Sequence, residues 1–429
     1  MKILLKNANS FGQTSKLERC DILIEGNKVK TIKPYISCEV DRVIDCEEQL
    51  LLPGFIDIHV HLREPGGEEK ETIKTGTMAA ARGGFTTVCA MPNTNPVPDS
   101  IEKLQHLQEM LKNEAIVRVL PYAAISKELA GEQLTKIPAL AKEGAFAFTD
   151  DGVGIQTAGM MYEAMKQAAQ VKMPIVAHCE DNSLLYGGVI HDGEVNRRLK
   201  LPGIRAISES VQIARDVLLA EATGCHYHVC HVSTKESVRI IRDAKRAGIH
   251  VTAEVTPHHL LLNENDIMGD NANYKMNPPL RSEADQQALL DGLLDGTIDF
   301  IATDHAPHTE REKAEGFYDA PFGIVGLETA FSLLYTYLVK TELVTLHQLV
   351  DWLTKKPAEV FRLPYGKLEE NGVADLTLIN LANASKIDKY TFLSKGRNTP
   401  FHQYEVFGEV EWTMVDGKIV YKKDCYTKK

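Results

Sequence analysis

Short apolar runs alternate with amphipathic helical patterns through the middle of the chain, between residues 53 and 365. The strand-like runs include 86–91, 174–178, 226–231, 250–255 and 298–303, and helical patterns between them cover 208–221 and 235–247. Strands that alternate with helices favour a parallel sheet, because each parallel pair needs a crossover long enough to hold a helix. About eight such units in about 300 residues predict a closed (β/α)8 barrel of the α/β class.

The two ends of the chain have a different pattern, of short strands joined by turns. Residues 21–29 predict a hairpin with a Gly-Asn turn. Residues 374–379 and 411–421 predict further strands, the second segment interrupted by an Asp-Gly turn. Neither end has enough strands for a stable sheet on its own, so we expect the N-terminal and C-terminal strands to pair with each other.

The overall composition restricts the class of protein. A hydrophobic fraction of 44% and a charged fraction of 25% are those of a soluble globular protein. A formal net charge of −11 without a long basic run argues against nucleic acid and anionic membrane surfaces as partners. No run approaches the roughly 20 apolar residues of a membrane span, and the N-terminal apolar segment is too short for a signal peptide. The eight cysteines form no CxxC pair, which is typical of reduced thiols in the cytoplasm.

Two histidines one residue apart end the first apolar run of the predicted barrel. On a strand, side chains alternate with a period of two, so His59 and His61 project from the same face. Neutral histidine is the commonest metal ligand in proteins. Taken alone, the pair is either two structural histidines at a strand end or half of a metal site.

The same residue types end four further runs. They are Asp150 and Asp151 after 144–149, His178 after 174–177, His231 after 226–230 and Asp304 after 298–303. Each alone could be a helix N-cap or a packed polar residue. In a barrel, however, the C-terminal ends of all strands meet at one mouth. Four histidines with Asp304 and one aspartate of the pair 150–151 are too many for one tetrahedral zinc and suit two metals that share a bridge.

The motifs at these strand ends resemble those of a known family. The segments are PGFIDIHVHLREPG at 53–66, MPNT at 91–94 and ATDHAPH at 302–308. Over essentially its whole length the chain resembles the amidohydrolase superfamily, and within it the bacterial type I dihydroorotases. The resemblance implies a TIM-type barrel at 53–365. It also implies a small composite β-sandwich built from both termini, 1–52 with 366–429.

The resemblance implies two zinc ions per chain. Their ligands would be His59, His61, Asp151, His178, His231 and Asp304. Many relatives bridge the two metals with a carboxylated lysine. In the bacterial type I group an aspartate takes that place, and the match falls on Asp151, which leaves Asp150 as a neighbouring or capping residue.

The implied reaction is the reversible cyclisation of N-carbamoyl-L-aspartate to (S)-dihydroorotate in pyrimidine synthesis. A zinc-bound bridging hydroxide would attack the ring amide, with Asp304 as general base and then general acid. Arg63 lies two residues beyond His61, and its guanidinium could grip the substrate carboxylate with two hydrogen bonds if the strand continues that far. The further substrate contacts implied by the resemblance are His61, Asn93, Asn277, His308 and the backbone of Phe322 and Gly323.

Other polar residues receive structural interpretations. His226, His228, His258 and His259 are expected to be core or rim residues, and His305 should point away from the site. The charged segment 309–320 lacks core periodicity and predicts a mobile loop over the mouth.

Two alternatives differ in substrate or in class. Dihydropyrimidinase, hydantoinase and allantoinase act on cyclic amides without an exocyclic carboxylate, so Arg63 with Asn93 is the discriminating feature. A non-catalytic paralogue beside a transcarbamoylase would usually lack metal ligands, and all six are present. The expected partner is a small-molecule substrate, and the resemblance adds a homodimer.

Overall fold

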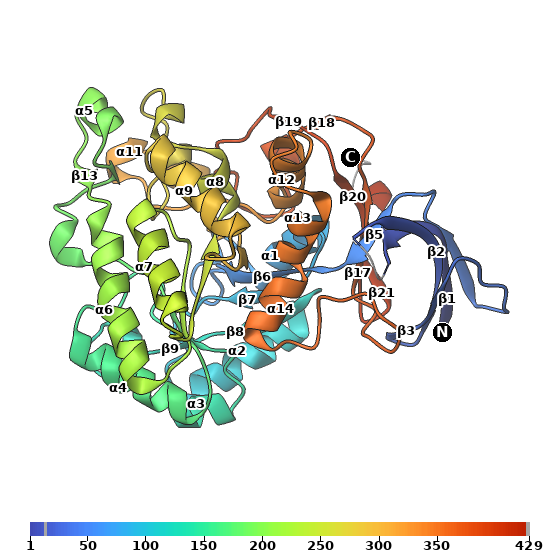
Figure 1. The fold of residues 1–429 in the computed structure, drawn as a ribbon, viewed down its shortest axis with the longest axis horizontal. Coiled ribbons are helices and arrows are strands. Elements are labelled where there is room, and N and C mark those ends of the chain that lie inside the picture. Colours follow the sequence, from blue (N-terminus) through green and yellow to red (C-terminus); the bar gives the residue numbers. More distant parts are fainter. Residues whose placement is uncertain (13–14, 426–429) are drawn as a thin grey trace.

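The computed structural model describes residues 1–12 and 15–425 and divides the chain into a helix-covered barrel and a curved terminal sheet, which contains the first and the last strand of the chain (Figure 1). The sheet has eight strands, in the order β21-β20-β17-β5-β1-β2-β3, with β4 beside β1. Their bounds are β1 Lys2–Phe11, β2 Leu17–Glu25, β3 Lys28–Lys33, β4 Arg42–Asp45, β5 Leu50–Pro53, β17 Leu376–Asn380, β20 Glu409–Val415 and β21 Lys418–Lys422.

The two chain ends pair as predicted, because β5 runs antiparallel to β17 with Leu51 opposite Leu378. Both predicted hairpins form: Glu25 pairs with Lys28 across the Gly-Asn turn, and Val415 pairs with Lys418 across the Asp-Gly turn. Alternate side chains of the sheet bury one apolar cluster that includes residues from both ends of the chain.

One part of the C-terminal region leaves this sheet. Strands β18 (Ser385–Lys386) and β19 (Glu405–Val406) pair only with each other. The segment between them packs its apolar side chains, such as Phe392 and Phe401, against Ile324 of the barrel. The boundaries of the two predicted domains stay a prediction, and residues 13–14 and 426–429 of the terminal one lie outside the described residues.

The barrel wall consists of parallel strands. They are β6 Phe55–Val60, β7 Phe85–Ala90, β8 Arg118–Pro121 continued by β9 Ala123–Ala124, β10 Phe148–Thr149, β11 Ile175–Ala177, β14 Tyr227–Val229, β15 Val251–Val255 and β16 Phe300–Ile301. The wall closes where Val60 pairs with His305 and the His61 amide donates to the His305 carbonyl at 2.9 Å. This is the predicted (β/α)8 barrel.

Asp57 links the first barrel strand to the last. Its carboxylate accepts hydrogen bonds from the Thr303 hydroxyl at 2.5 Å and from the Thr303 amide at 3.1 Å. It also accepts from the amide of His59 at 3.1 Å, and burial raises the pKa of Asp57 to about 6. The aspartate that opens the DxHxH motif therefore has a structural role that the sequence analysis did not assign.

Helices cover the outside of the barrel (Figure 1). The helices are α1 Ile73–Arg82, α2 Ile101–Glu114, α3 Ile137–Lys142, α4 Ala158–Gln170, α6 Ile207–Thr223, α7 Lys235–Arg246, α9 Glu283–Leu294, α13 Leu346–Leu353 and α14 Lys355–Phe361. Helix α7 illustrates how the sequence sets them: the Thr234 side chain caps its first turn, and Val238 and Ile241 lie on its buried face. Within the described residues no helix is long and apolar enough to cross a membrane.

Shorter elements lie in the connections. They are α5 Glu194–Leu199, α8 Pro257–Leu261, α10 Glu310–Lys313, α11 Gly316–Asp319, α12 Ala330–Leu334, and the strand pair β12 Ile190–His191 with β13 Gly203–Ile204. The segment 309–320, which the sequence predicts to be a mobile loop, contains the two short helices α10 and α11, and its mobility stays a prediction. Thr309 caps α10, and Phe317 of α11 is buried in an apolar cluster, so local capping and one anchoring ring give this segment helical structure.

Candidate metal centre

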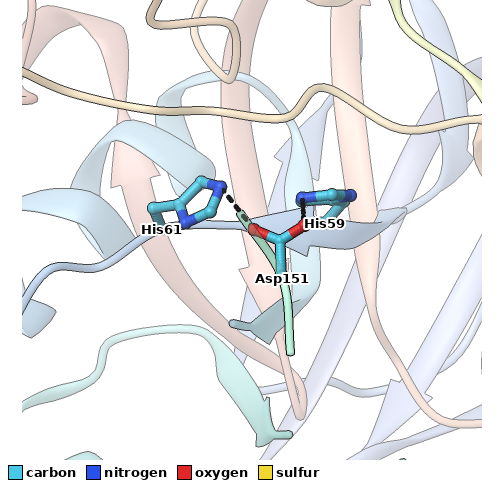
Figure 2. A group of neighbouring side chains, drawn as sticks. All are labelled: His59, His61 and Asp151. Carbon is cyan, nitrogen blue, oxygen red and sulfur yellow. Dashed lines mark ion pairs between the residues drawn. The ribbon is translucent and has the colours of Figure 1, made fainter. Parts of the chain in front are cut away.

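His59 and His61 meet the Asp151 carboxylate at the mouth of the barrel. Figure 2 shows the carboxylate of Asp151, which follows β10, between the two imidazoles from the end of β6. His59 Nε2 lies 3.4 Å from Asp151 Oδ1, and His61 Nε2 lies 3.6 Å from Asp151 Oδ2. The two rings are 5.4 Å apart, so the strand brings both histidines to one place as the HxH spacing predicted.

The same carboxylate reaches a second pair of histidines. Asp151 Oδ1 lies 4.0 Å from His178 Nδ1 and 3.9 Å from His231 Nε2. Those two nitrogens are 3.0 Å from each other. The Asp151 carboxylate thus lies near both pairs of imidazoles, which is the arrangement that a bridging ligand requires.

Asp304 completes the cluster from the opposite side. Its Oδ1 lies 3.0 Å from His61 Nε2 and 3.4 Å from His59 Nε2. Asp304 and His231 have φ values of 49° and 30°, a region that residues other than glycine seldom occupy. Backbone strain of this kind collects at functional sites, where surrounding structure holds the residue in place.

All six predicted ligands are buried, with exposed fractions between 0% and 7%. Burial alone would lower the pKa of His59, but the carboxylates of Asp151 and Asp304 raise it well above its usual value. Burial would likewise raise the pKa of Asp151, yet the neighbouring imidazoles of His59, His61 and His178 hold it well below the usual range. The cluster therefore pairs ionised carboxylates with buried imidazoles that favour a positive charge, an environment suited to a bound cation.

The donor set fits divalent metal ions. His59 Nε2 and Asp151 Oδ1 are buried and have no hydrogen-bond partner, which costs about 1–3 kcal/mol for each group. Four groups of mutually close ligand atoms contain these residues: His59, His61 and Asp151; His59, His231 and Asp304; Asp151, His178 and His231; and His59, Cys230 and Glu254. Imidazole nitrogen and carboxylate oxygen are ligands that zinc prefers, so an ion would satisfy both orphaned atoms.

Arg63 lies beside the cluster in a conformation that the sequence analysis did not expect. Strand β6 ends at Val60, and Arg63 has a φ of 62°, so strand alternation does not place its side chain. Its Nε donates to the Pro307 carbonyl at 3.2 Å. His308 Nε2 lies 2.8 Å from the Phe322 carbonyl and 3.2 Å from Arg63 Nη2. Because His308 Nε2 must donate to that carbonyl, it cannot accept from Arg63, and the guanidinium keeps N–H groups for a ligand.

Two asparagines predicted as substrate contacts also support histidines of the cluster. Asn93 Oδ1 accepts from His61 Nδ1 at 3.0 Å. Asn277 Nδ2 donates to Glu180 Oε2 at 2.8 Å and lies 3.4 Å from His178 Nε2. The Oδ1 of Asn277 is buried without a hydrogen-bond partner, so it could accept a bond from a ligand.

The backbone at Gly323 is already engaged within the protein. Its N–H donates to the Lys275 carbonyl at 3.0 Å, and its carbonyl accepts from Lys313 Nζ and Asn398 Nδ2, both at 3.0 Å. Substrate contact by Phe322 and Gly323 therefore stays a prediction.

The remaining polar residues take structural positions. Asp150 accepts from the amides of Ile125 and Ser126 at 2.8 and 3.0 Å, which agrees with a capping role. His259 bonds the Thr256 hydroxyl and the Pro278 carbonyl, whereas buried His258 has an Nε2 without a partner. His305 contacts Glu71 at 3.4 Å rather than the cluster.

Sequence reasoning missed Glu254, whose Oε1 lies 2.7 Å from His59 Nδ1. The available signal was a charged residue inside a predicted barrel strand, because a carboxylate that is buried there needs a partner.

The fold and the buried cluster together define a metal-dependent amidohydrolase on a (β/α)8 barrel. An L-hydantoinase (dihydropyrimidinase) from Arthrobacter aurescens superimposes with a TM-score of 0.87 at 26% identity, over 98% of this chain and 96% of that one. A dihydropyrimidinase from Brevibacillus agri NCHU1002 has the same TM-score at 23% identity, over 100% of this chain and 96% of that one, and shows the shared fold alone.

Sequence comparison places the chain more narrowly. The dihydroorotase of Staphylococcus aureus (strain Mu50) is 64% identical over 423 residues, which cover 98% of this chain and 99% of that protein. The dihydroorotase of Staphylococcus epidermidis (strain ATCC 12228) is 61% identical over the same shares. A profile of the Dihydro-orotase-like family matches residues 48–237. The chain belongs to the dihydroorotase family.

Proposed function

We propose that this chain is a dihydroorotase, which reversibly cyclises N-carbamoyl-L-aspartate to (S)-dihydroorotate. Two zinc ions would be held by His59, His61, Asp151, His178, His231 and Asp304. The observation that carries the proposal is the position of Asp151, whose carboxylate lies within 4.0 Å of both histidine pairs in a fully buried cluster. Membership of the dihydroorotase family gives the substrate class.

Side chains of the protein would carry out the proton transfers of the reaction. A bound divalent ion lowers the pKa of water and polarises a carbonyl oxygen. Asp304, held between His59 and His61, takes the proton of the attacking water and delivers it to the leaving ring nitrogen. In the cyclisation direction Asp304 would remove the proton from the attacking carbamoyl nitrogen and deliver it to the hydroxyl group that leaves the carboxyl carbon as water.

Arg63 supports dihydroorotate over the other cyclic amides. The hydantoinase-type neighbours share the fold, so the fold does not choose the substrate. The substrate of a dihydroorotase carries an exocyclic carboxylate, and the Arg63 guanidinium, fixed through its Nε by the Pro307 carbonyl, can bind it with two parallel bonds.

A substrate panel on the zinc-loaded protein tests the reaction. We expect hydrolysis of dihydroorotate and cyclisation of N-carbamoyl-L-aspartate, with hydantoin and dihydrouracil as poor substrates. A kcat/KM for dihydrouracil comparable to that for dihydroorotate would move the activity to the hydantoinase type.

Metal analysis of the wild type and two variants tests the proposed ion count. The wild type should bind two zinc ions per chain, and His178→Ala and His231→Ala should each lose one while keeping the ion at His59, His61 and Asp304. A wild type that saturates at one ion with full activity would contradict the binuclear site. Homodimer assembly and a cytoplasmic location stay predictions.

A further inference from the structure

A chain of hydrogen bonds runs from buried His59 through Glu254 and His228 to half-buried His226. His59 Nδ1 lies 2.7 Å from Glu254 Oε1, and the other oxygen of Glu254 lies 3.2 Å from His228 Nε2. His228 Nδ1 lies 2.8 Å from the Thr252 hydroxyl, which in turn lies 2.7 Å from His226 Nε2. Glu254, His59 and His228 have no exposed surface.

The positions of the protons along this chain follow from its chemistry. A carboxylate can only accept, so His59 Nδ1 and His228 Nε2 both donate to Glu254. His228 Nδ1 then accepts from the Thr252 hydroxyl, and Thr252 accepts from His226 Nε2. Burial lowers the pKa of His226 to about 3, and with its proton on Nε2 the neutral ring is the donor that Thr252 needs. Both contacts of Glu254 therefore have one direction, His59 carries a proton on Nδ1, and an ion bound at Nε2 would take the place of a proton there.

We propose that Glu254 is a positioning residue of the metal centre, which holds His59 as the Nδ1–H tautomer and directs the lone pair of its Nε2 toward an ion. This inference rests on the proposed role of His59 as a ligand. Carboxylates that hold a ligating histidine typically change metal affinity by about 10–100-fold when they are removed. His228 in turn fixes the orientation of Glu254.

The two histidines of the HxH motif differ in their support. His61 Nδ1 donates to the neutral amide of Asn93 at 3.0 Å, whereas His59 Nδ1 donates to an anion. Glu254 pairs with two imidazoles and, among the described residues, with no lysine or arginine, so a cation on the far side of His59 would balance its charge. The asymmetry predicts that loss of Glu254 weakens the ion at His59 more than the ion at His178 and His231.

The experiment compares zinc affinity of the wild type and Glu254→Gln by competition with a chromophoric chelator, alongside circular dichroism and thermal unfolding of the metal-free proteins. Gln keeps the size of the side chain but loses the charge and can accept from only one imidazole. We expect about a 10–100-fold loss of affinity for one of the two ions. Asp216→Asn is the matched control, because Asp216 is a fully buried carboxylate that bonds Arg215 and Tyr227 outside the cluster.

Equal zinc affinity in wild type and Glu254→Gln would overturn the proposal, as would an equal loss in Asp216→Asn. A wild type that binds no zinc would instead overturn the proposed function, and this inference with it. If Glu254→Gln does not fold, the variant His228→Phe tests the same positioning role. Phe keeps the stack on Phe300, whose ring lies 5.2 Å from that of His228, but cannot donate to Glu254. We expect a several-fold loss of zinc affinity, and an unchanged affinity would overturn the positioning role.

Discussion

At the scale of single residues, Asp304 is proposed both to ligate a metal ion and to transfer a proton, and one substitution affects both roles. Its Oδ1 lies 3.0 Å from His61 Nε2 and 3.4 Å from His59 Nε2, and the imidazoles keep the pKa of this buried carboxyl below its usual value. A carboxylate that stays ionised at neutral pH can accept a proton in the reaction and can also ligate a metal.

Asp304→Asn should reduce turnover by at least about 10²–10⁴-fold, because the amide cannot accept the proton. The measurement is steady-state kinetics in both directions, with metal content determined on the same samples. Asp150→Asn is a useful comparison, since Asp150 is buried one residue from Asp151 but bonds backbone amides. Turnover within a few-fold of the wild type would exclude Asp304 as the proton carrier.

Arg63→Lys should raise KM for dihydroorotate by about 10–100-fold with a smaller change in kcat. An ammonium keeps the charge but cannot offer two parallel N–H groups, and a charge-assisted hydrogen bond contributes roughly 1.5–3 kcal/mol. Lysine also loses the bond from Nε to the Pro307 carbonyl that orients the side chain. Kinetics at saturating zinc measure the change, and an unaltered KM would mean that the carboxylate binds elsewhere.

At the scale of elements, Lys313 ties the helical segment over the mouth to the loops that carry predicted substrate contacts. Its Nζ donates to the carbonyls of Lys275, Pro321 and Gly323 at 3.1, 2.9 and 3.0 Å. Asn398 adds a second tie from the C-terminal region, because its amide donates to the Ala306 and Gly323 carbonyls. Lys313, the last residue of α10, thus links this helix to the neighbouring loops by hydrogen bonds.

Lys313→Met should loosen these loops and raise KM by several-fold while kcat changes less. Methionine has a similar length but no N–H, so the Pro321 carbonyl loses this donor, at about 1–3 kcal/mol if the group stays buried. The Lys275 and Gly323 carbonyls also lose it, but they keep their bonds from the Gly323 amide and from Asn398. Steady-state kinetics and thermal unfolding give the two readouts. Lys112→Met, an exposed lysine of α2, is the control. A KM equal to that of the control would show that α10 does not position the substrate loops.

At the scale of the whole molecule, buried neutral histidines link stability to pH. Burial lowers the pKa of His226 to about 3 and those of His191 and His259 to about 4, below the ordinary value of 6.5. Between about pH 4 and 6.5 the unfolded chain therefore binds more protons than the folded one, so stability falls as the pH falls through this window.

The expected loss is about 1.4 kcal/mol per pH unit for each such histidine. Chemical unfolding at a series of pH values in this window measures it. His191→Gln should reduce the slope of the unfolding free energy against pH by about the contribution of one histidine, because glutamine does not titrate. Its side chain can still accept a hydrogen bond from Arg281, which lies 3.3 Å from His191 Nδ1. A stability that is constant from about pH 6.5 to about 5 would contradict this prediction.

The sequence alone determined the features that depend on neighbours along the chain. Strand and helix periodicity predicted the alternating barrel units and the turns of both terminal hairpins, because periodicity and turn chemistry are local properties. The convergence of His59, Asp151 and Asp304 was also foreseeable, since parallel strands bring their C-terminal ends to one mouth. Their roles as metal ligands remain proposals.

Only the tertiary structure decided the contacts between residues far apart in sequence. The bonds from Asp57 to Thr303 and from His59 to Glu254 join separate barrel strands, and no local pattern encodes which buried polar groups will meet. The conformation of Arg63 and the helical form of the segment 309–320 depend likewise on tertiary contacts, with the Pro307 carbonyl and with the apolar cluster around Phe317. Periodicity predicts which face of a strand carries a side chain, but the closure of the barrel determines which residue of another strand that side chain contacts.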